Sequence, residues 1–330
     1  MNIRKSIAAL SDAEKKAFVN ALIELKKQGK YDQYVHWHHH VMIPTVFPNE
    51  PNDPNYRNGA HRGPAFLPWH RAFLKAVEND LQQIDKSVTI PYWDWVADSK
   101  LPDPKSAPIW DKNFMGGDGN ESNSNIVESG AFAFTMGNWN IVMDDAGPEL
   151  RRSLGRFKAG NISIDTLPNE DDLRLAMTEA FYDVPNSNNS PFTIGFRNRL
   201  EGWITKRGDY RVKTDGSQLH NRVHLWVGGS MMPMTSPNDP VFFLHHCYVD
   251  KVLADWQEIQ KINNPEATPH YVPVSGGPKG HNLKDVLAPF KLTVEETLDN
   301  TKLGVVYEKS MKSFDIADFS WQPISPFWAD

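Results

Sequence analysis

The chain has 330 residues, slightly above the size at which one hydrophobic core stops growing, so one large domain or two small domains are allowed. Hydrophobic residues make up 40% and charged residues 23% of the chain, which excludes a disordered or collagen-like protein. The 41 acidic residues outnumber the 35 basic residues, the net charge is -6, and no basic stretch stands out. This charge balance argues against a nucleic-acid partner.

The sequence also indicates where the protein works. Its apolar runs are too short to cross a membrane. The apolar stretch at 7–10 follows Arg4 and Lys5 and ends at Ser11, so no secretory signal is predicted. The single cysteine, Cys247, permits no intrachain disulfide and fits a reducing compartment. We therefore expect a cytoplasmic protein, or one exported on a partner protein, with no membrane contact.

Helical patterns dominate the predicted secondary structure. Ser11 and Glu14 form a capping-box pattern that predicts the start of a helix, and Gly29 predicts its end. Apolar residues at helical spacing predict further helices over 69–84, 219–226 and 240–262. Strand patterns are short, as at 210–213, and long stretches rich in Pro, Asn, Asp and Gly lie at 44–64, 98–125, 183–195 and 263–282. The fold class expected is mainly α, with long ordered loops that carry function or wrap the core.

Ten of the twelve histidines fall into two groups, at 36–70 and 220–246. His220 and His224 are four residues apart, which places both side chains on one face of the predicted helix and suits a single metal ion. His245 and His246 follow on the next helix, beside Phe242 and Phe243. Histidines with purely structural roles would be scattered, whereas each of these groups is able to supply three metal ligands.

The composition of the two groups indicates the metal. Neither group contains an acidic residue at ligand spacing. Neutral imidazole suits copper, zinc, iron and nickel. Two metal ions held only by neutral imidazoles keep their full positive charge, which favours copper and O₂ chemistry over zinc and hydrolysis.

Four motifs resemble those of bacterial tyrosinases, which are type-3 dicopper enzymes related to catechol oxidases and molluscan hemocyanins. The motifs are GPAFLPWHR at 63–71, PYWDW at 91–95, HNRVH at 220–224 and SPNDPVFFLHH at 236–246. The resemblance covers roughly residues 30 to 260. It implies a central four-helix bundle that holds a binuclear type-3 copper centre, with O₂ as co-substrate.

We expect a catalytic domain over 1–310 and a C-terminal tail over 311–330 that packs on the body. The aromatic residues of this tail, Trp321, Phe327 and Trp328, would then either pack against the body or cover the entrance of the active site.

The resemblance also implies the ligands. One copper would take His38, His61 and His70, and the other would take His220, His224 and His246. The choice of His38 stays open, because His36 and His40 form a rival pair four residues apart. His245 is expected behind the ligands, and Asp250 is expected to orient a ligand imidazole or else to form a surface ion pair.

The implied activity is ortho-hydroxylation of monophenols and oxidation of o-diphenols to quinones, a reaction of melanin formation. At pH 7 a phenol with a pKa near 10 loses its proton at a cost of about 4 kcal/mol. In tyrosinases a Glu and an Asn are proposed to hold the water that takes this proton, and Glu201 and Asn221 match them. Glu201 has a structural alternative, an ion pair with Arg197 or Arg199.

Further implications concern specificity and partners. The entrance is expected to be lined by apolar residues that would favour uncharged phenols: Leu225, Met232, Met234 and Phe243. The substrates expected are small phenols and catechols, and some relatives also use a carrier protein that delivers copper. The alternatives are a catechol oxidase or o-aminophenol oxidase without monophenolase activity and, more remotely, an O₂ carrier or a zinc hydrolase.

Overall fold

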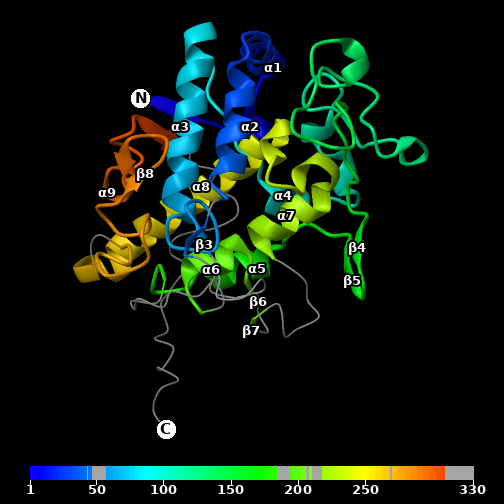
Figure 1. Ribbon diagram of the computed structural model, residues 1–330. Helices are drawn as coiled ribbons and strands as arrows, with labels where there is room; N and C mark the ends of the chain where they lie inside the picture. Colours follow the sequence, from blue (N-terminus) through cyan, green and yellow to red (C-terminus); the bar gives the residue numbers. More distant parts are fainter. Residues whose placement is uncertain are drawn as a thin grey trace.

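A computed structural model describes residues 1–42, 44–46, 57–183, 193–205, 208–209, 218–267 and 270–308 (Figure 1). Helices dominate this part of the chain, as expected. They are α1 (Asp12–Lys27), α2 (Lys30–His40), α3 (Phe66–Ile84), α4 (Trp95–Asp98), α5 (Glu170–Met177), α6 (Phe196–Glu201), α7 (Leu219–Val227), α8 (Val241–Asn263) and α9 (Val294–Thr297). Among the described helices, none is long and apolar enough to span a lipid bilayer.

Within the described residues the strands are short and pair two by two. Four antiparallel pairs join neighbours in the chain: β2 (Pro44–Val46) with β3 (Arg57–Asn58), β4 (Phe157–Ala159) with β5 (Ile162–Ile164), β6 (Ile204–Thr205) with β7 (Gly208–Asp209), and β8 (Val286–Leu287) with β9 (Leu292–Thr293). The fifth pair is parallel and joins β1 (Asn2–Arg4) to β10 (Val305–Tyr307). The last described segment is therefore fastened beside the N-terminus of the chain (Figure 1).

The predicted helices are confirmed. The Ser11 side chain accepts from the Glu14 backbone and the Glu14 side chain accepts from the Ser11 backbone, so the expected capping box begins α1. Helices α3, α7 and α8 occupy the ranges expected for them to within three residues. Helices α2 and α6 were not expected as separate elements. The strand pattern at 210–213 and the tail at 311–330 lie outside the described residues.

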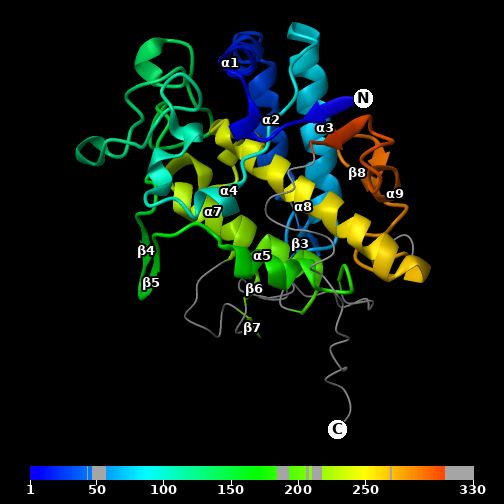
Figure 2. The same ribbon diagram turned by 180° about the vertical axis from the view of Figure 1, so that it is seen from behind.

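The histidine-bearing helices are at the centre of the molecule. Helix α8 runs obliquely across α3, and the two form the most extensive helix contact (Figure 2). Helix α1 packs against α2 and α3, and α7 packs against α8. Along 241–254 every residue of α8 is buried, so this helix has no solvent face over its first 14 positions. The histidines that α8 carries are therefore enclosed by the core.

Candidate metal centre

The first histidine group joins three separate segments of the chain. His38 lies on α2, His61 lies in the loop after β3, and His70 lies on the first turns of α3. One ring nitrogen from each of these side chains lies within 4.8 Å of the other two. This is the set of three that the resemblance implied for one metal ion.

Burial separates His38 from its neighbours. His38 is only 2% exposed, whereas His36, His39 and His40 are exposed on the other sides of α2. Nδ1 of His38 lies 2.7 Å from the carbonyl oxygen of Met234. A carbonyl only accepts, so Nδ1 is the donor and Nε2 has a free lone pair. That Nε2 is buried without a hydrogen-bond partner. The rival pair His36 and His40 points away from the group.

His61 and His70 are oriented in the same way. Nδ1 of His70 lies 2.8 Å from the carbonyl oxygen of Phe66, one turn earlier in α3, and its Nε2 is buried without a partner. Nδ1 of His61 lies 3.3 Å from Oδ1 of Asn58, an oxygen that also accepts from the backbone of His61. Such contacts behind an imidazole fix its tautomer and leave Nε2 to bind a metal. Asn58 is not among the residues predicted from the sequence, because no pattern points to it.

The second group converges more tightly. His220 and His224 lie on α7 and His246 lies on α8. The Nε2 atoms of His220 and His224 are 3.1 Å apart, and each lies 3.3 Å from Nε2 of His246. Nδ1 of His224 donates to the carbonyl oxygen of Met231 at 2.7 Å. Because Nδ1 of His220 and Nδ1 of His224 donate to oxygen atoms, their Nε2 lone pairs face each other, an arrangement that a bound cation stabilises.

The electrostatics of both groups keep these imidazoles neutral. Burial lowers the pKa of His38 to about 3 and that of His224 to about 4. Burial, and then the neighbouring imidazoles, hold the pKa values of His70, His220 and His246 well below the ordinary value of histidine. At neutral pH each ring is therefore uncharged and able to donate a lone pair. A set of neutral nitrogen donors with orphaned Nε2 atoms fits copper.

The two groups adjoin one another. The ring of His70 stacks on the ring of His246 with centroids 4.2 Å apart and 11° between the planes. Phe242 packs against both groups, at 4.1 Å from His246 and 5.0 Å from His38. Phe66 likewise contacts His70 at 5.0 Å and His220 at 4.8 Å. These two apolar rings bring the groups together in a dry environment; Phe242 was expected beside His246, whereas Phe66 was not singled out.

His245 lies beside the second group and shares its surroundings. Its ring stacks on that of His220 at 5.1 Å with 18° between the planes. One of its nitrogen atoms lies within 4.8 Å of those of the other three, and both its ring nitrogens are buried without a hydrogen-bond partner. Its nitrogens make none of the 3.1–3.3 Å contacts that join His220, His224 and His246. The position agrees with a residue behind the ligands.

Glu201 and Asn221 lie next to the second group. Asn221 Oδ1 is 2.9 Å from Nδ1 of His220, and the carbonyl oxygen of Glu201 is 3.3 Å from the same nitrogen. The Glu201 carboxylate is 1% exposed and accepts from the backbone N–H of Arg62 at 2.6 Å and from Arg197 at 2.8 Å. The expected alternative, an ion pair with Arg197, is therefore present.

A glycine permits this arrangement between α6 and α7. Gly202 has φ +104°, and a Cβ atom there would lie 2.1 Å from the Gln218 carbonyl oxygen and 3.0 Å from Cβ of Asn221. Only glycine tolerates both the backbone conformation and the close approach. The end of α6 can therefore lie against the start of α7.

Two sequence predictions are wrong. Asp250 does not contact a ligand imidazole, since its carboxylate pairs with Arg71 at 2.5 Å and Arg4 at 3.3 Å, and it is 3% exposed rather than at the surface. Phe243 is 0% exposed and packs against Tyr31 and Phe73 in the core, so it does not line an entrance. Asp250 therefore forms an ion pair, as its alternative expected, but in the core and not at the surface.

The other proposed entrance residues differ in exposure. Met232 is 47% exposed, whereas Leu225 and Met234 are partly buried. Met234 contributes its carbonyl oxygen to His38, so its backbone helps to position a histidine. That Leu225, Met232 and Met234 line an entrance to the site stays a proposal.

The fold and the site together define a class, a helical-bundle metalloprotein with two adjoining imidazole groups that each suit a copper ion. The comparisons with known proteins agree. Residues 28–259 match the family described as the common central domain of tyrosinase. The chain is 40% identical over 303 residues to a tyrosinase of Streptomyces glaucescens, covering 91% of this chain and 97% of the relative. It is also 33% identical to a grixazone synthase of Streptomyces griseus, covering 92% and 98%.

Solved structures share the fold. A polyphenol oxidase from Thermothelomyces thermophila matches with a TM-score of 0.66 at 20% identity, covering 93% of this chain and 88% of that one. A functional unit of octopus hemocyanin matches with a TM-score of 0.56 at 19% identity, covering 93% and 68%. The chain belongs to the tyrosinase family and is an enzyme, a copper-dependent oxidoreductase with the binuclear copper centre of that family.

Proposed function

We propose that the enzyme is a tyrosinase in the full sense, using O₂ to hydroxylate monophenols and to oxidise o-diphenols to o-quinones. The observation that carries this proposal is the contact between the two three-histidine groups, in which His70 stacks on His246. When bound, the copper pair supplies the binding and activation of O₂. The protein holds six neutral imidazoles in place and excludes water from them with Phe66 and Phe242.

The ligand assignment is part of this proposal. His38, His61 and His70 would hold one copper and His220, His224 and His246 the other, each through Nε2. The Nδ1 atoms of His38, His70 and His224 are occupied by carbonyl oxygens, which supports Nε2 as the metal-binding atom. His245 would support His220 by stacking rather than bind copper.

Glu201 and Asn221 would handle the phenol proton. Burial raises the pKa of Glu201 above the ordinary value, against the opposing effect of Arg197, so this carboxylate is a better base than an exposed one. A carboxylate has about four acceptor sites, and those of Glu201 receive Arg62, Arg197 and the Trp203 side chain. One site is left for a water shared with Asn221. In this proposal that water takes the proton as the phenol becomes phenolate.

The surroundings of the site bear on how copper arrives. His38, His70, His220 and His246 are each at most 3% exposed. His61 and His224, one proposed ligand of each group, are partly exposed, so copper has only a narrow approach to the site. We propose that a copper-delivery protein assists loading, and a folded apoprotein that takes up free copper as fast as it takes up copper in the presence of a delivery protein would contradict this.

A second candidate is an oxidase of o-diphenols or o-aminophenols without monophenolase activity. The similarity to a relative named grixazone synthase rather than tyrosinase favours it. O₂ uptake by the copper-loaded enzyme, with L-tyrosine and L-DOPA supplied separately, tests both. Uptake with each substrate supports the tyrosinase, uptake with L-DOPA alone supports the second candidate, and O₂ binding without turnover would leave only a carrier.

A further inference from the structure

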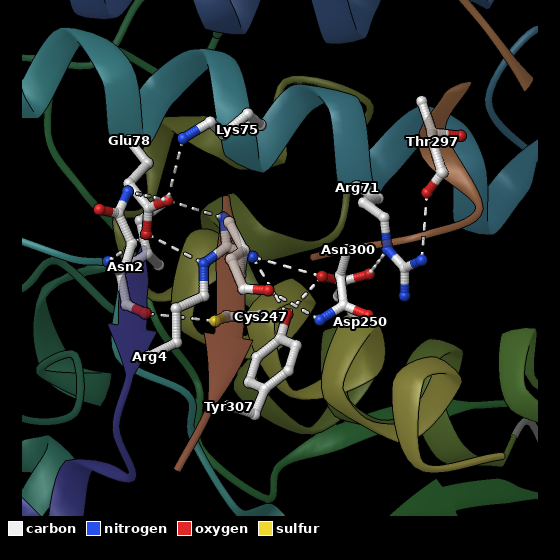
Figure 3. Close-up of polar contacts among 12 residues, drawn as sticks. Asn2, Arg4, Arg71, Lys75, Glu78, Cys247, Asp250, Thr297, Asn300 and Tyr307 are labelled. Atoms are coloured by element: carbon white, nitrogen blue, oxygen red, sulfur yellow. Dashed lines mark hydrogen bonds and ion pairs between the residues drawn. The ribbon is translucent and has the colours of Figure 1, made fainter. Parts of the chain in front are cut away.

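A buried ion pair lies directly beside the copper ligands and joins the two helices that carry them. Arg71 follows His70 on α3, and Asp250 comes one turn after His246 on α8. Nε of Arg71 donates to Oδ1 of Asp250 at 2.5 Å (Figure 3). The pair therefore connects α3 to α8 within one turn of a proposed ligand on each side.

A second connection lies further along α3 and reaches α8 at the same residue, Asp250. Arg4, on the N-terminal strand β1, donates to Glu78 on α3 at 3.0 Å and to Asp250 on α8 at 3.3 Å (Figure 3). Arg71 and Glu78 are seven residues apart, which is roughly 10 Å along α3. Because the two connections leave α3 at different residues and meet at Asp250 on α8, they resist sliding of α3 along α8.

The surrounding contacts hold the Arg71 guanidinium through its Nε and Nη1 atoms. Its Nη1 atom donates to the carbonyl oxygens of Thr297 and Leu298 at 3.1 and 2.8 Å and to the side chain of Gln257 at 3.2 Å. Gln257 is itself on α8, two turns beyond Asp250. Arg71 therefore hydrogen-bonds to α8 at two positions, Asp250 and Gln257. A planar group with several donors is needed for both bonds.

Burial makes this cluster a poor candidate for a purely stabilising role. Arg4, Arg71, Glu78 and Asp250 have side chains that are 0–3% exposed, with two positive and two negative charges. Desolvation offsets most of the attraction in such a pair, and the best-attested use of buried polar groups is to fix register. The apolar contacts between α3 and α8, such as Phe73 with Phe242, are less directional and tolerate a shift more easily.

We propose that Arg71 and Asp250, together with Arg4 and Glu78, are positioning residues that lock the register of α3 against α8 and so set the spacing between the two three-histidine groups. A slip of one residue along a helix is about 1.5 Å. A shift of that size is large beside the 4.2 Å between the ring centroids of His70 and His246, so it would change the spacing of the two groups. The inference rests on the copper pair of the proposed function, but not on the choice of phenol.

The substitution Arg71→Lys tests the proposed role in helix register, because lysine keeps the positive charge but lacks the planar group with several donors. Arg152→Lys is the matched control: Arg152 forms an equally buried ion pair with Asp239, with side chains 0% exposed, that does not join α3 to α8. Each protein is loaded with copper(II), its copper is counted, and its EPR spectrum is recorded. Two copper(II) ions that share a bridging ligand couple their spins and give no signal, whereas separated ions give one.

The expected result is two copper ions per chain in all three proteins, with an EPR signal only in Arg71→Lys. Three results would overturn the proposal. The first is an Arg71→Lys protein that holds two copper ions and gives no EPR signal, and the second is an equal EPR signal from both variants. The third is loss of copper from Arg71→Lys while Arg152→Lys keeps its copper. Glu78→Gln, which weakens the second tie, is expected to give a smaller signal than Arg71→Lys. Failure of the copper pair itself would be recognised separately, as fewer than two ions or an EPR signal in the unaltered protein.

Discussion

The rings of His70 and His246 lie nearly parallel, 4.2 Å apart, although 176 residues separate them in the chain. Each belongs to a different histidine group and a different helix. Neutral rings stack in this way in a dry core, and the low pKa values that burial gives both histidines keep them neutral at pH 7. This contact brings the two histidine groups side by side, as a binuclear centre requires.

The histidines of α2 provide the first prediction. Only His38 of the four points into the first group, and its Nε2 is buried without a partner. His38→Ala is expected to reduce the copper content from two ions per chain to one. His36→Ala, His39→Ala and His40→Ala change exposed side chains and are expected to keep both ions. Metal analysis of the four purified variants decides this, and copper loss from His36→Ala or His40→Ala would contradict the assignment.

The second prediction separates the two activities at Glu201. Glu201→Gln keeps the shape of the side chain and removes the base beside Asn221. General base catalysis is worth roughly 10²–10⁴-fold, so kcat for a monophenol is expected to fall by at least about tenfold. Oxidation of an o-diphenol, which loses its protons more easily, is expected to change less.

The control for this prediction uses the ion pair. Arg197 keeps Asp183 as a partner at 2.6 Å when the charge of Glu201 is removed, so the fold is expected to persist. The thermal transition of Glu201→Gln should therefore stay close to that of the unaltered enzyme. Equal losses of monophenol and diphenol turnover would show that Glu201 acts only through the structure.

Gly202 gives the third prediction. A methyl group at this position would meet the Gln218 carbonyl oxygen at 2.1 Å, and the backbone has φ +104°. Overpacking costs about 1–3 kcal/mol, and the left-handed conformation adds about 1–2 kcal/mol for a residue with a Cβ. We expect Gly202→Ala to lower the free energy of unfolding by the sum of both and to weaken binding of the second copper.

Gly137 is the matched control for the backbone effect. It has φ +70°, but an added Cβ would meet no atom within 4 Å. Gly137→Ala is therefore expected to show only the cost of the backbone conformation, with normal copper content. Urea unfolding of both apoproteins compares the costs, and equal losses would mean that the approach of α6 to α7 is not tight.

The fourth prediction concerns pH. Burial raises the pKa of Asp98 to about 6, although its carboxylate accepts from the Trp93 indole at 2.7 Å. At pH values between these two pKa values, the Asp98 carboxyl keeps its proton in the folded state, whereas the unfolded state, with a pKa near 3.9, releases it. This contribution to stability is complete below pH 3.9 and is lost as the pH rises through about 6.

Asp98→Asn removes that dependence and keeps an acceptor for Trp93. With allowance for the partial exposure of the side chain, the variant is expected to gain about 1–2 kcal/mol at pH 7 and little at pH 4. Urea titrations of both proteins at the two pH values measure this. A gain of the same size at pH 4 would mean that Asp98 is charged in the folded state throughout.

Much of the metal centre could be predicted from the sequence, because helical spacing places His220 beside His224 and the motifs extend over most of the bundle. The errors occurred on α8. Its first 14 positions are all buried, so hydrophobic periodicity does not distinguish the face of Phe242 from that of Phe243. The partners of Asp250 depend on tertiary contacts with Arg71 and with Arg4, which is 246 positions away. No local pattern carries that information.

The most direct test of the binuclear centre is a crystal structure of the copper-loaded protein with anomalous data collected at the copper absorption edge. We predict two anomalous peaks inside the bundle, one contacted by Nε2 of His38, His61 and His70 and the other by Nε2 of His220, His224 and His246. A single peak, or a peak bound by His36, His40 or His245 in place of a predicted ligand, would contradict the account.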